Sequence, residues 1–187
     1  MKGLLIFIIA LVVSMSSYSQ TKKQSACDSL IQEGYTQAFC DYNNNYAFKN
    51  IPFESNYSFF SSKIKLDKVS ILPNTYTITD IDFREWAGLT FDYAVFKFSA
   101  KDKLESVLLK LKRENKDSTE LENNFLETLN YLTHYFGHEK PSQNDYLNEK
   151  NNFHWCGNKV NIHFGQPHKN VIELMIERTN INDLDNL

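Results

Sequence analysis

Strict alternation of apolar and polar residues around Gly157-Asn158 is the feature that most constrains the fold of this chain. Because successive side chains of a strand point to opposite faces, the pattern predicts an antiparallel hairpin with a two-residue turn at Gly157-Asn158. One face of this hairpin carries Phe153, Trp155, Val160, Ile162 and Phe164. The other face carries His154, Cys156, Lys159, Asn161 and His163. A sheet with one buried and one wet face requires a second layer on its buried side.

Shorter patterns elsewhere predict further strands and two helices. Alternating runs predict strands over Thr75–Ile81, Leu89–Phe98, Leu104–Lys112 and Val171–Arg178. A first helix is expected after Ser55 as its N-cap, running to Ile64. A second begins with a capping box from Thr119 to Glu122 and ends at Gly137. These elements predict a two-layer α+β fold, an antiparallel sheet with helices on one face.

Two parts of the sequence resemble one another. Trp86-Ala87-Gly88 and Trp155-Cys156-Gly157 lie 69 residues apart, as do Phe60 and Leu129 within the two predicted helices. At an offset of 65 residues, Val107, Leu109, Leu111 and Arg113 align with Ile172, Leu174, Ile176 and Arg178. We infer two copies of a helix–three-strand unit, at residues 53–113 and 119–178.

This arrangement resembles two groups of exported proteins that are built from helices and small antiparallel sheets. One is the β-lactamase inhibitor protein, which consists of tandem helix-and-sheet repeats. The other is the small helix-plus-three-strand lipoprotein of the outer-membrane assembly machine. The resemblance is architectural and covers most of residues 53–178, so no functional residue is transferred from either group. It implies a role in binding another protein.

The N-terminus has the pattern of a secretory signal peptide. Met1-Lys2-Gly3 is followed by ten apolar residues, Leu4–Val13, and then by small and polar residues. The apolar run spans about 15 Å as a helix, too short for a hydrocarbon core of about 30 Å. We expect cleavage between Ser19 and Gln20, and hence an exported protein without a stable membrane anchor, either periplasmic or secreted.

Composition sets the class of the protein, and the sequence patterns divide the remaining chain into segments. The whole chain has 187 residues, a net charge of −3 and 42% hydrophobic residues, which excludes a disordered chain and a basic nucleic-acid binder. After the signal peptide at 1–19, we expect an N-terminal helical segment with cysteines at 20–50. The α+β domain follows at 51–180, and residues 181–187 form a polar tail.

Three cysteines remain after export to a compartment where disulfides form. Cys27 and Cys40 flank a helix-like stretch, and a straight helix of that length would hold them about 20 Å apart. A bridge between them therefore requires a break, which Gly34 supplies. This is the favoured pairing, with Cys40–Cys156 and three unbridged thiols as the alternatives.

Cys156 is a candidate exposed thiol. Trp155-Cys156-Gly157 resembles the start of a thioredoxin active site, but the second cysteine of that motif is absent. In the predicted register, Lys159 lies opposite Cys156 and would lower the pKa of its thiol.

The histidines and carboxylates predict no metal, cofactor or catalytic site. In the predicted register His154 faces Asn161, so His154 and His163 are diagonal neighbours at about 7–8 Å. This leaves a two-histidine site as the alternative, and two solvated surface histidines are the favoured interpretation. His134 and His138 have the spacing of a helical metal pair, but Gly137 interrupts it. The acidic residues Asp80, Asp82 and Glu85 are interpreted as a solvated loop.

These observations favour an exported, non-enzymatic binding module that contacts a protein partner through its sheet or loops. The alternative is a carrier that holds a small apolar molecule between helix and sheet, suggested by the 14 Phe and 10 Tyr. An enzyme of unknown class is the third hypothesis. The sequence does not identify the partner or the oligomeric state.

Overall fold

The computed structural model describes residues 27–45, 47–49, 51–86, 88–112, 118–138, 140–141, 152–168 and 170–179. The predicted signal peptide, its cleavage site at Ser19 and Gln20, and the predicted tail at 181–187 lie outside these residues. Within the described ranges, no helix is both long and apolar enough to cross a membrane.

The chain is built around one eight-stranded antiparallel sheet. In spatial order its strands are β3 (Asp67–Lys68), β4 (Thr75–Ile78), β7 (Tyr93–Phe98), β8 (Leu104–Lys112), β12 (Val171–Arg178), β11 (Val160–His168), β10 (Asn152–Cys156) and β9 (Lys140–Pro141). Two small hairpins lie outside this sheet, β1 (Ala47–Phe48) with β2 (Ile51–Pro52), and β5 (Glu85–Trp86) with β6 (Leu89–Thr90).

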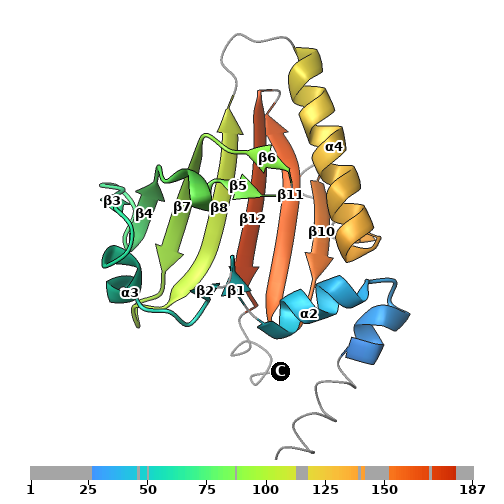
Figure 1. The fold of residues 1–187 in the computed structure, drawn as a ribbon, viewed down its shortest axis with the longest axis horizontal. Coiled ribbons are helices and arrows are strands. Elements are labelled where there is room, and N and C mark those ends of the chain that lie inside the picture. The colour runs from blue at the N-terminus through green and yellow to red at the C-terminus, as the bar shows by residue number, and fades with distance from the viewer. Residues whose placement is uncertain are drawn as a thin grey trace, which may run out of the picture.

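The helices form a second layer on one face of the sheet (Figure 1). They are α2 (Gln37–Asn45), α3 (Tyr57–Ser61) and α4 (Ser118–Phe136), with helical residues also at 27–32 and a 3-10 turn η1 (Ile81–Phe83). The ring of Phe60 in α3 packs 5.4 Å from that of Phe96 in β7. In α4, Phe125 stacks on Phe164 of β11 with ring centroids 4.9 Å apart. The predicted α+β fold, with an antiparallel sheet, is therefore confirmed.

Aromatic rings fill the space between the two layers. The largest side chains with less than 2% exposure are Trp155, Phe39, Phe48, Phe53, Phe60, Phe91, Phe96, Phe136 and Phe164. Many of them meet edge to face, an arrangement worth about 0.5–1.5 kcal/mol per pair beyond burial itself. The indole nitrogen of Trp155 donates a hydrogen bond to the carbonyl of Gly137 at 3.0 Å, so its burial leaves no polar atom unsatisfied.

Gly137 ends α4, as the sequence predicts, with a φ of +95° that favours glycine. A Cβ at this position would meet the backbone of Gly34 and Tyr35. This close approach lets the Thr36 amide donate to the Phe136 carbonyl at 3.1 Å. The end of α4 is thereby joined to the segment that precedes α2.

The predicted N-cap is wrong for both helices. The N-cap of α3 is Asn56, not Ser55, because the Ser55 carbonyl accepts a hydrogen bond from the Leu104 amide at 3.1 Å. Helix α4 begins at Ser118, so Thr119 lies inside its first turn.

Two predicted strands are shorter than expected. The strand from Thr75 ends at Ile78 because Asp80 caps η1, its carboxylate accepting from the Asp82 amide at 3.1 Å. The run Leu89–Phe98 is divided between β6 and β7. The Arg84 guanidinium donates to the carbonyls of Phe91 and Asp92, which bends the chain between the two strands.

The hairpin register differs from the prediction by two residues. Trp155 pairs with Ile162, His154 with His163 and Cys156 with Asn161, so the connection is longer than a two-residue turn. Asn43 of α2 accounts for this, because its side-chain oxygen accepts from the amides of Lys159 at 3.0 Å and Val160 at 3.2 Å. A shift of two residues keeps every side chain on its predicted face but changes its cross-strand neighbour.

The strand order has a mirror arrangement about the β8–β12 pair. Leu109 and Leu174, which align at the offset of 65 residues, lie directly opposite each other there. Trp86 does not follow this arrangement, because it belongs to the small β5–β6 hairpin whereas Trp155 lies in the main sheet. The two-copy repeat stays a prediction, in which Trp86 and Trp155 do not occupy corresponding strands.

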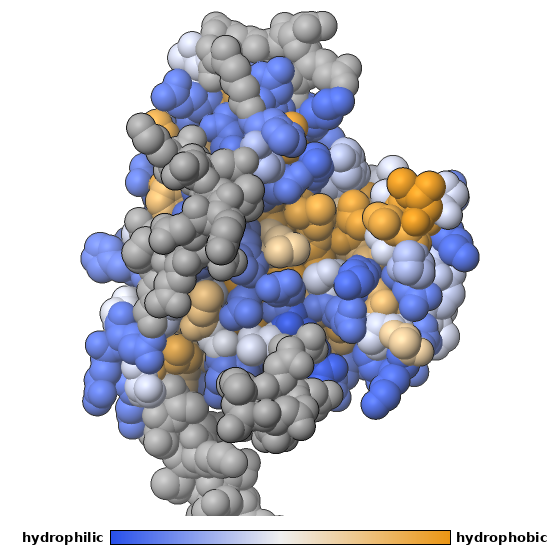
Figure 2. All heavy atoms as spheres, turned by 180° about the vertical axis from the view of Figure 1, so that it is seen from behind, coloured by the Kyte–Doolittle hydropathy of each residue, from blue (hydrophilic) through white to orange (hydrophobic). Residues whose placement is uncertain are grey.

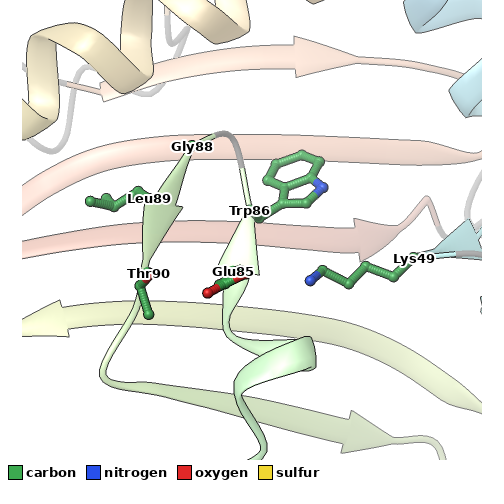
Figure 3. Close-up of a pocket in the computed structure, with 6 residues that line it drawn as sticks. All are labelled: Lys49, Glu85, Trp86, Gly88, Leu89 and Thr90. Carbon is green, nitrogen blue, oxygen red and sulfur yellow. The ribbon is translucent and has the colours of Figure 1, made fainter.

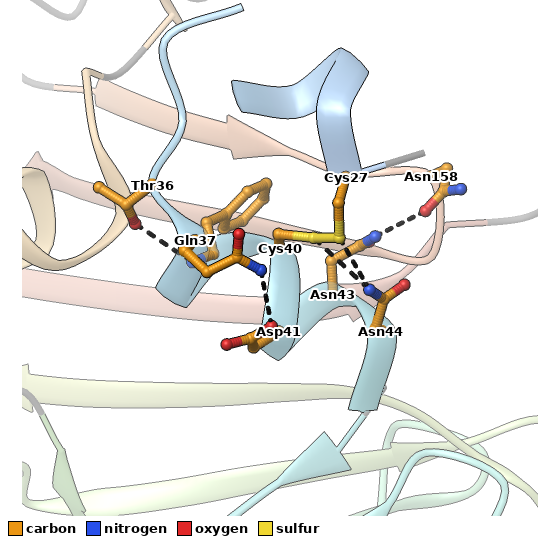
Figure 4. The surroundings of a disulfide bond; sticks show 9 residues. Cys27, Thr36, Gln37, Cys40, Asp41, Asn43, Asn44 and Asn158 are labelled. Atoms are coloured by element: carbon orange, nitrogen blue, oxygen red, sulfur yellow. Dashed lines mark hydrogen bonds between the residues drawn. A yellow bond between two sulfur atoms is a disulfide. The ribbon is translucent and has the colours of Figure 1, made fainter. Parts of the chain in front are cut away.

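A disulfide joins Cys27 and Cys40, the pairing favoured above, with Cα atoms 5.4 Å apart (Figure 4). The helical residues 27–32 and α2 are separated at Gly34, whose φ is +96°. The break folds the two helical segments back on one another and brings the sulfurs together.

Candidate functional site

The face of the sheet opposite the helices is open in the described part of the chain. No described helix or small hairpin packs on it, and Figure 2 shows an apolar area there, flanked by hydrophilic surface. Five long or central strands, β7, β8, β12, β11 and β10, form this face. At a spacing of about 4.8 Å they make it about 20 Å wide.

One row of side chains crosses this face from strand to strand. The strand registers place Val95, Leu108, Met175, His163 and His154 directly opposite one another in that order. All five are partly exposed. Three neighbouring members of the row are therefore apolar, and the other two are a pair of imidazoles. We call this set the central row.

Charged residues flank the central row on both sides. On one side Lys97 and Glu177 lie in the next row, and Lys97 is 3.5 Å from Glu105. On the other side the ammonium of Lys110 forms an ion pair with Glu173 across β8 and β12. The open face thus combines a narrow apolar centre with charges of both signs.

His154 and His163 contact each other within the central row. Their rings meet edge to face with centroids 4.5 Å apart, and their Nδ1 atoms are 2.5 Å apart. The other ring nitrogen of His163, Nε2, lies 2.9 Å from a carboxylate oxygen of Glu177. The three side chains form a hydrogen-bonded chain from Glu177 through His163 to His154.

The electrostatics of these three hydrogen-bonded side chains favour neutral imidazole at His154 and ionised carboxylate at Glu177. Burial and the neighbouring His163 lower the pKa of His154, against a smaller opposing effect of Glu177. The hydrogen bond from His163 lowers the pKa of Glu177, outweighing the effect of burial. An ionised Glu177 accepts a proton-bearing Nε2, and in a neutral His163 the lone pair is then on Nδ1.

The prediction of two separately solvated histidines is therefore wrong. It rested on the two-residue turn, which placed His154 and His163 on a diagonal. In the observed register they are direct partners. The contact of Asn43 with the hairpin, which sets this register, comes from a residue more than a hundred positions away, and no local pattern indicates it.

Cys156 is exposed on the same face but lies opposite Asn161 rather than Lys159. The predicted pairing with Lys159 is wrong for the same reason, and with it the proposed cause of a lowered thiol pKa. The backbone amide of Cys156 donates to the hydroxyl of Tyr35 at 3.1 Å.

A separate pocket of about 440 Å³ lies on the helix side of the sheet, beside the β5–β6 hairpin (Figure 3). It is lined by Lys49, Glu85, Trp86, Gly88, Leu89 and Thr90. The Lys49 ammonium donates to the carbonyl of Asp82, and burial lowers the pKa of Lys49 against the opposing charges of Glu85, Asp82 and Asp80. The predicted acidic loop is thus arranged around a lysine that sequence reasoning missed.

The described residues hold no group of three or more His, Cys, Asp or Glu side chains placed to bind a metal ion. His134 and His138 are both exposed.

No protein-family model, curated protein or solved structure matches this chain. The resemblance to exported inhibitor and assembly proteins therefore stays an expectation.

Proposed function

We propose that this protein is an exported binding module that contacts a protein partner through the open face of its sheet. The observation that carries this proposal is the central row, in which Val95, Leu108 and Met175 lie side by side without a covering layer in the described structure. Apolar side chains gathered on one face favour association, because contact removes them from water.

The charges around this apolar centre support a protein rather than a lipid partner. Lys97, Lys110, Glu173 and Glu177 provide both signs of charge within one or two strands of the centre. Protein interfaces commonly have an apolar core with a polar, charged rim, and complementary charges give them specificity.

Export of the mature chain is part of the same proposal. It rests on the N-terminal pattern of Met1 to Gln20. The Cys27–Cys40 disulfide is consistent with an oxidising compartment.

The alternative of an apolar-ligand carrier has less support. The space between helices and sheet is filled by aromatic rings. The pocket beside β5 and β6 is large enough for a small molecule, but Lys49 and Glu85 line it, which suits a polar ligand better than an apolar one.

The test compares two matched variants of the tagged, full-length protein expressed in its own host. Leu108→Glu places a charge in the central row, whereas Leu126→Glu changes a leucine with 48% exposure on α4, in the opposite layer. Native mass spectrometry of gently purified complexes should show a discrete protein partner with the wild type and with Leu126→Glu. With Leu108→Glu the amount of that complex should fall at least tenfold, while the circular dichroism spectrum stays that of the wild type.

Retention of the partner by a folded Leu108→Glu variant would place the interface elsewhere. A bound mass of a few hundred daltons in place of a protein would favour the carrier hypothesis.

A further inference from the structure

We propose that His154 and His163 form a binding site for a divalent transition-metal ion such as Cu²⁺, Ni²⁺ or Zn²⁺, with Glu177 as the residue that orients His163. This inference concerns the histidine pair alone and does not depend on the protein-binding proposal.

The backbone places the two imidazoles at one point. His154 and His163 are direct partners in adjacent antiparallel strands, and β11 is paired on both sides, with β10 and with β12. The Nδ1 atoms face each other at 2.5 Å, and the rings are nearly perpendicular at 88°. Two imidazole nitrogens this close share either a proton or a cation, because two facing lone pairs repel.

Glu177 favours the form of His163 that binds a metal. Its carboxylate accepts the Nε2 proton of His163 at 2.9 Å, so the neutral form of His163 has its lone pair on Nδ1, toward His154. A histidine that binds a metal through one ring nitrogen commonly donates the other N–H to a carboxylate, which fixes the tautomer and increases the basicity of the ligand.

The distances require only a small adjustment. A metal–nitrogen bond of about 2.0–2.1 Å places two ligating nitrogens about 3.3 Å apart in tetrahedral geometry and about 2.9 Å apart in the square-planar geometry that Cu²⁺ prefers. The rings must therefore separate by less than about 1 Å, which small side-chain rotations supply on an open face. The backbone pairing of β10 and β11 does not need to change.

The pair provides two ligands, and the rest of the coordination shell is open. In the described part of the chain no third metal-ligating side chain joins them, and water can complete the shell. Imidazole nitrogens suit Cu²⁺, Ni²⁺ and Zn²⁺, and the usual order of stability predicts that Cu²⁺ binds more tightly than Ni²⁺ or Zn²⁺.

The test uses the full chain, purified without a polyhistidine tag and titrated with copper chloride or zinc chloride alone. Isothermal titration should show one Cu²⁺ per chain, and electron paramagnetic resonance should show two coordinated imidazole nitrogens. His154→Gln and His163→Gln should each weaken Cu²⁺ binding at least tenfold and leave one imidazole or none in the spectrum. Zn²⁺ should bind more weakly and with the same dependence on both histidines.

Two further variants give this test its specificity. Glu177→Gln should weaken binding by about 10–100-fold while both imidazoles remain in the spectrum, as expected for a positioning residue. His134→Gln, which changes an exposed histidine of α4, should bind as the wild type does. Equal affinity in His154→Gln or His163→Gln, or a spectrum with only one imidazole in the wild type, would overturn the site.

Discussion

The two faces of this sheet are made by the same strands, yet they use their side chains differently. On the buried face Phe96, Trp155 and Phe164 are at most 1% exposed. Phe96 meets rings from several segments of the helix layer, and Trp155 and Phe164 each pack against a ring of α4. On the open face each residue of the central row mainly meets its neighbours on adjacent strands. The buried face thus shares its stabilisation among many contacts, whereas the chemistry of the open face depends on which two residues lie opposite each other.

The largest expected effect is a difference in stability between a variant of the buried face and a variant of the open face. Trp155→Ala removes a fully buried indole together with its hydrogen bond to Gly137, and should lower the free energy of unfolding by about 3–5 kcal/mol. Met175→Ala, in the central row of the open face, should cost less than about 1 kcal/mol. Urea unfolding followed by circular dichroism measures both. Similar losses for the two variants would show that the open face is covered in solution.

An intermediate effect tests whether a contact on the buried side fixes which side chains are neighbours on the open face. Asn43 is 1% exposed, and Asn43→Ala leaves the amides of Lys159 and Val160 without their acceptor. We expect a loss of about 1–3 kcal/mol in unfolding free energy. The imidazole ¹⁵N chemical shifts of His154 and His163 should also move, because their contact depends on the hairpin register.

Asn130→Ala, at an exposed position of α4, is the control for Asn43→Ala and should change neither quantity. Unchanged imidazole shifts in a destabilised Asn43→Ala variant would mean that strand pairing alone fixes the register.

The difference between the faces also explains which features of the structure can be predicted from the sequence. The alternation from Phe153 to Phe164 correctly assigns each residue to a face, because burial has a period of two and survives a shift of two residues. The bounds of β8 (Leu104–Lys112) and the end of α4 at Gly137 are likewise local properties and are predicted correctly.

Cross-strand neighbours are a different kind of information. The histidine pair requires the exact register, which Asn43 sets from another element, and the pocket requires Lys49 to reach the loop at Asp82. Each depends on a contact between segments far apart in the chain, for which local propensity and periodicity carry no signal. A single sequence therefore reveals the layers of this protein but not its candidate sites.

The smallest expected effect is a pH dependence that belongs to the open face alone. The pKa of His154 is lowered in the folded protein by burial and by His163, so the unfolded chain takes up this proton at a higher pH than the folded chain does. Stability should therefore fall as the pH drops below the ordinary histidine pKa of about 6.5. The lowered pKa of Glu177 acts in the same direction but only in more acidic solution, as the pH falls below the ordinary glutamate pKa of about 4.3.

Urea unfolding at pH 7.5 and pH 5.5 thus separates the effect of His154 from that of Glu177. The wild type should lose stability between these two pH values, and His154→Gln should lose less. An equal loss in His154→Gln and in the exposed control His134→Gln would assign the effect to groups other than His154, and the burial of that imidazole would then not be coupled to folding in this pH range.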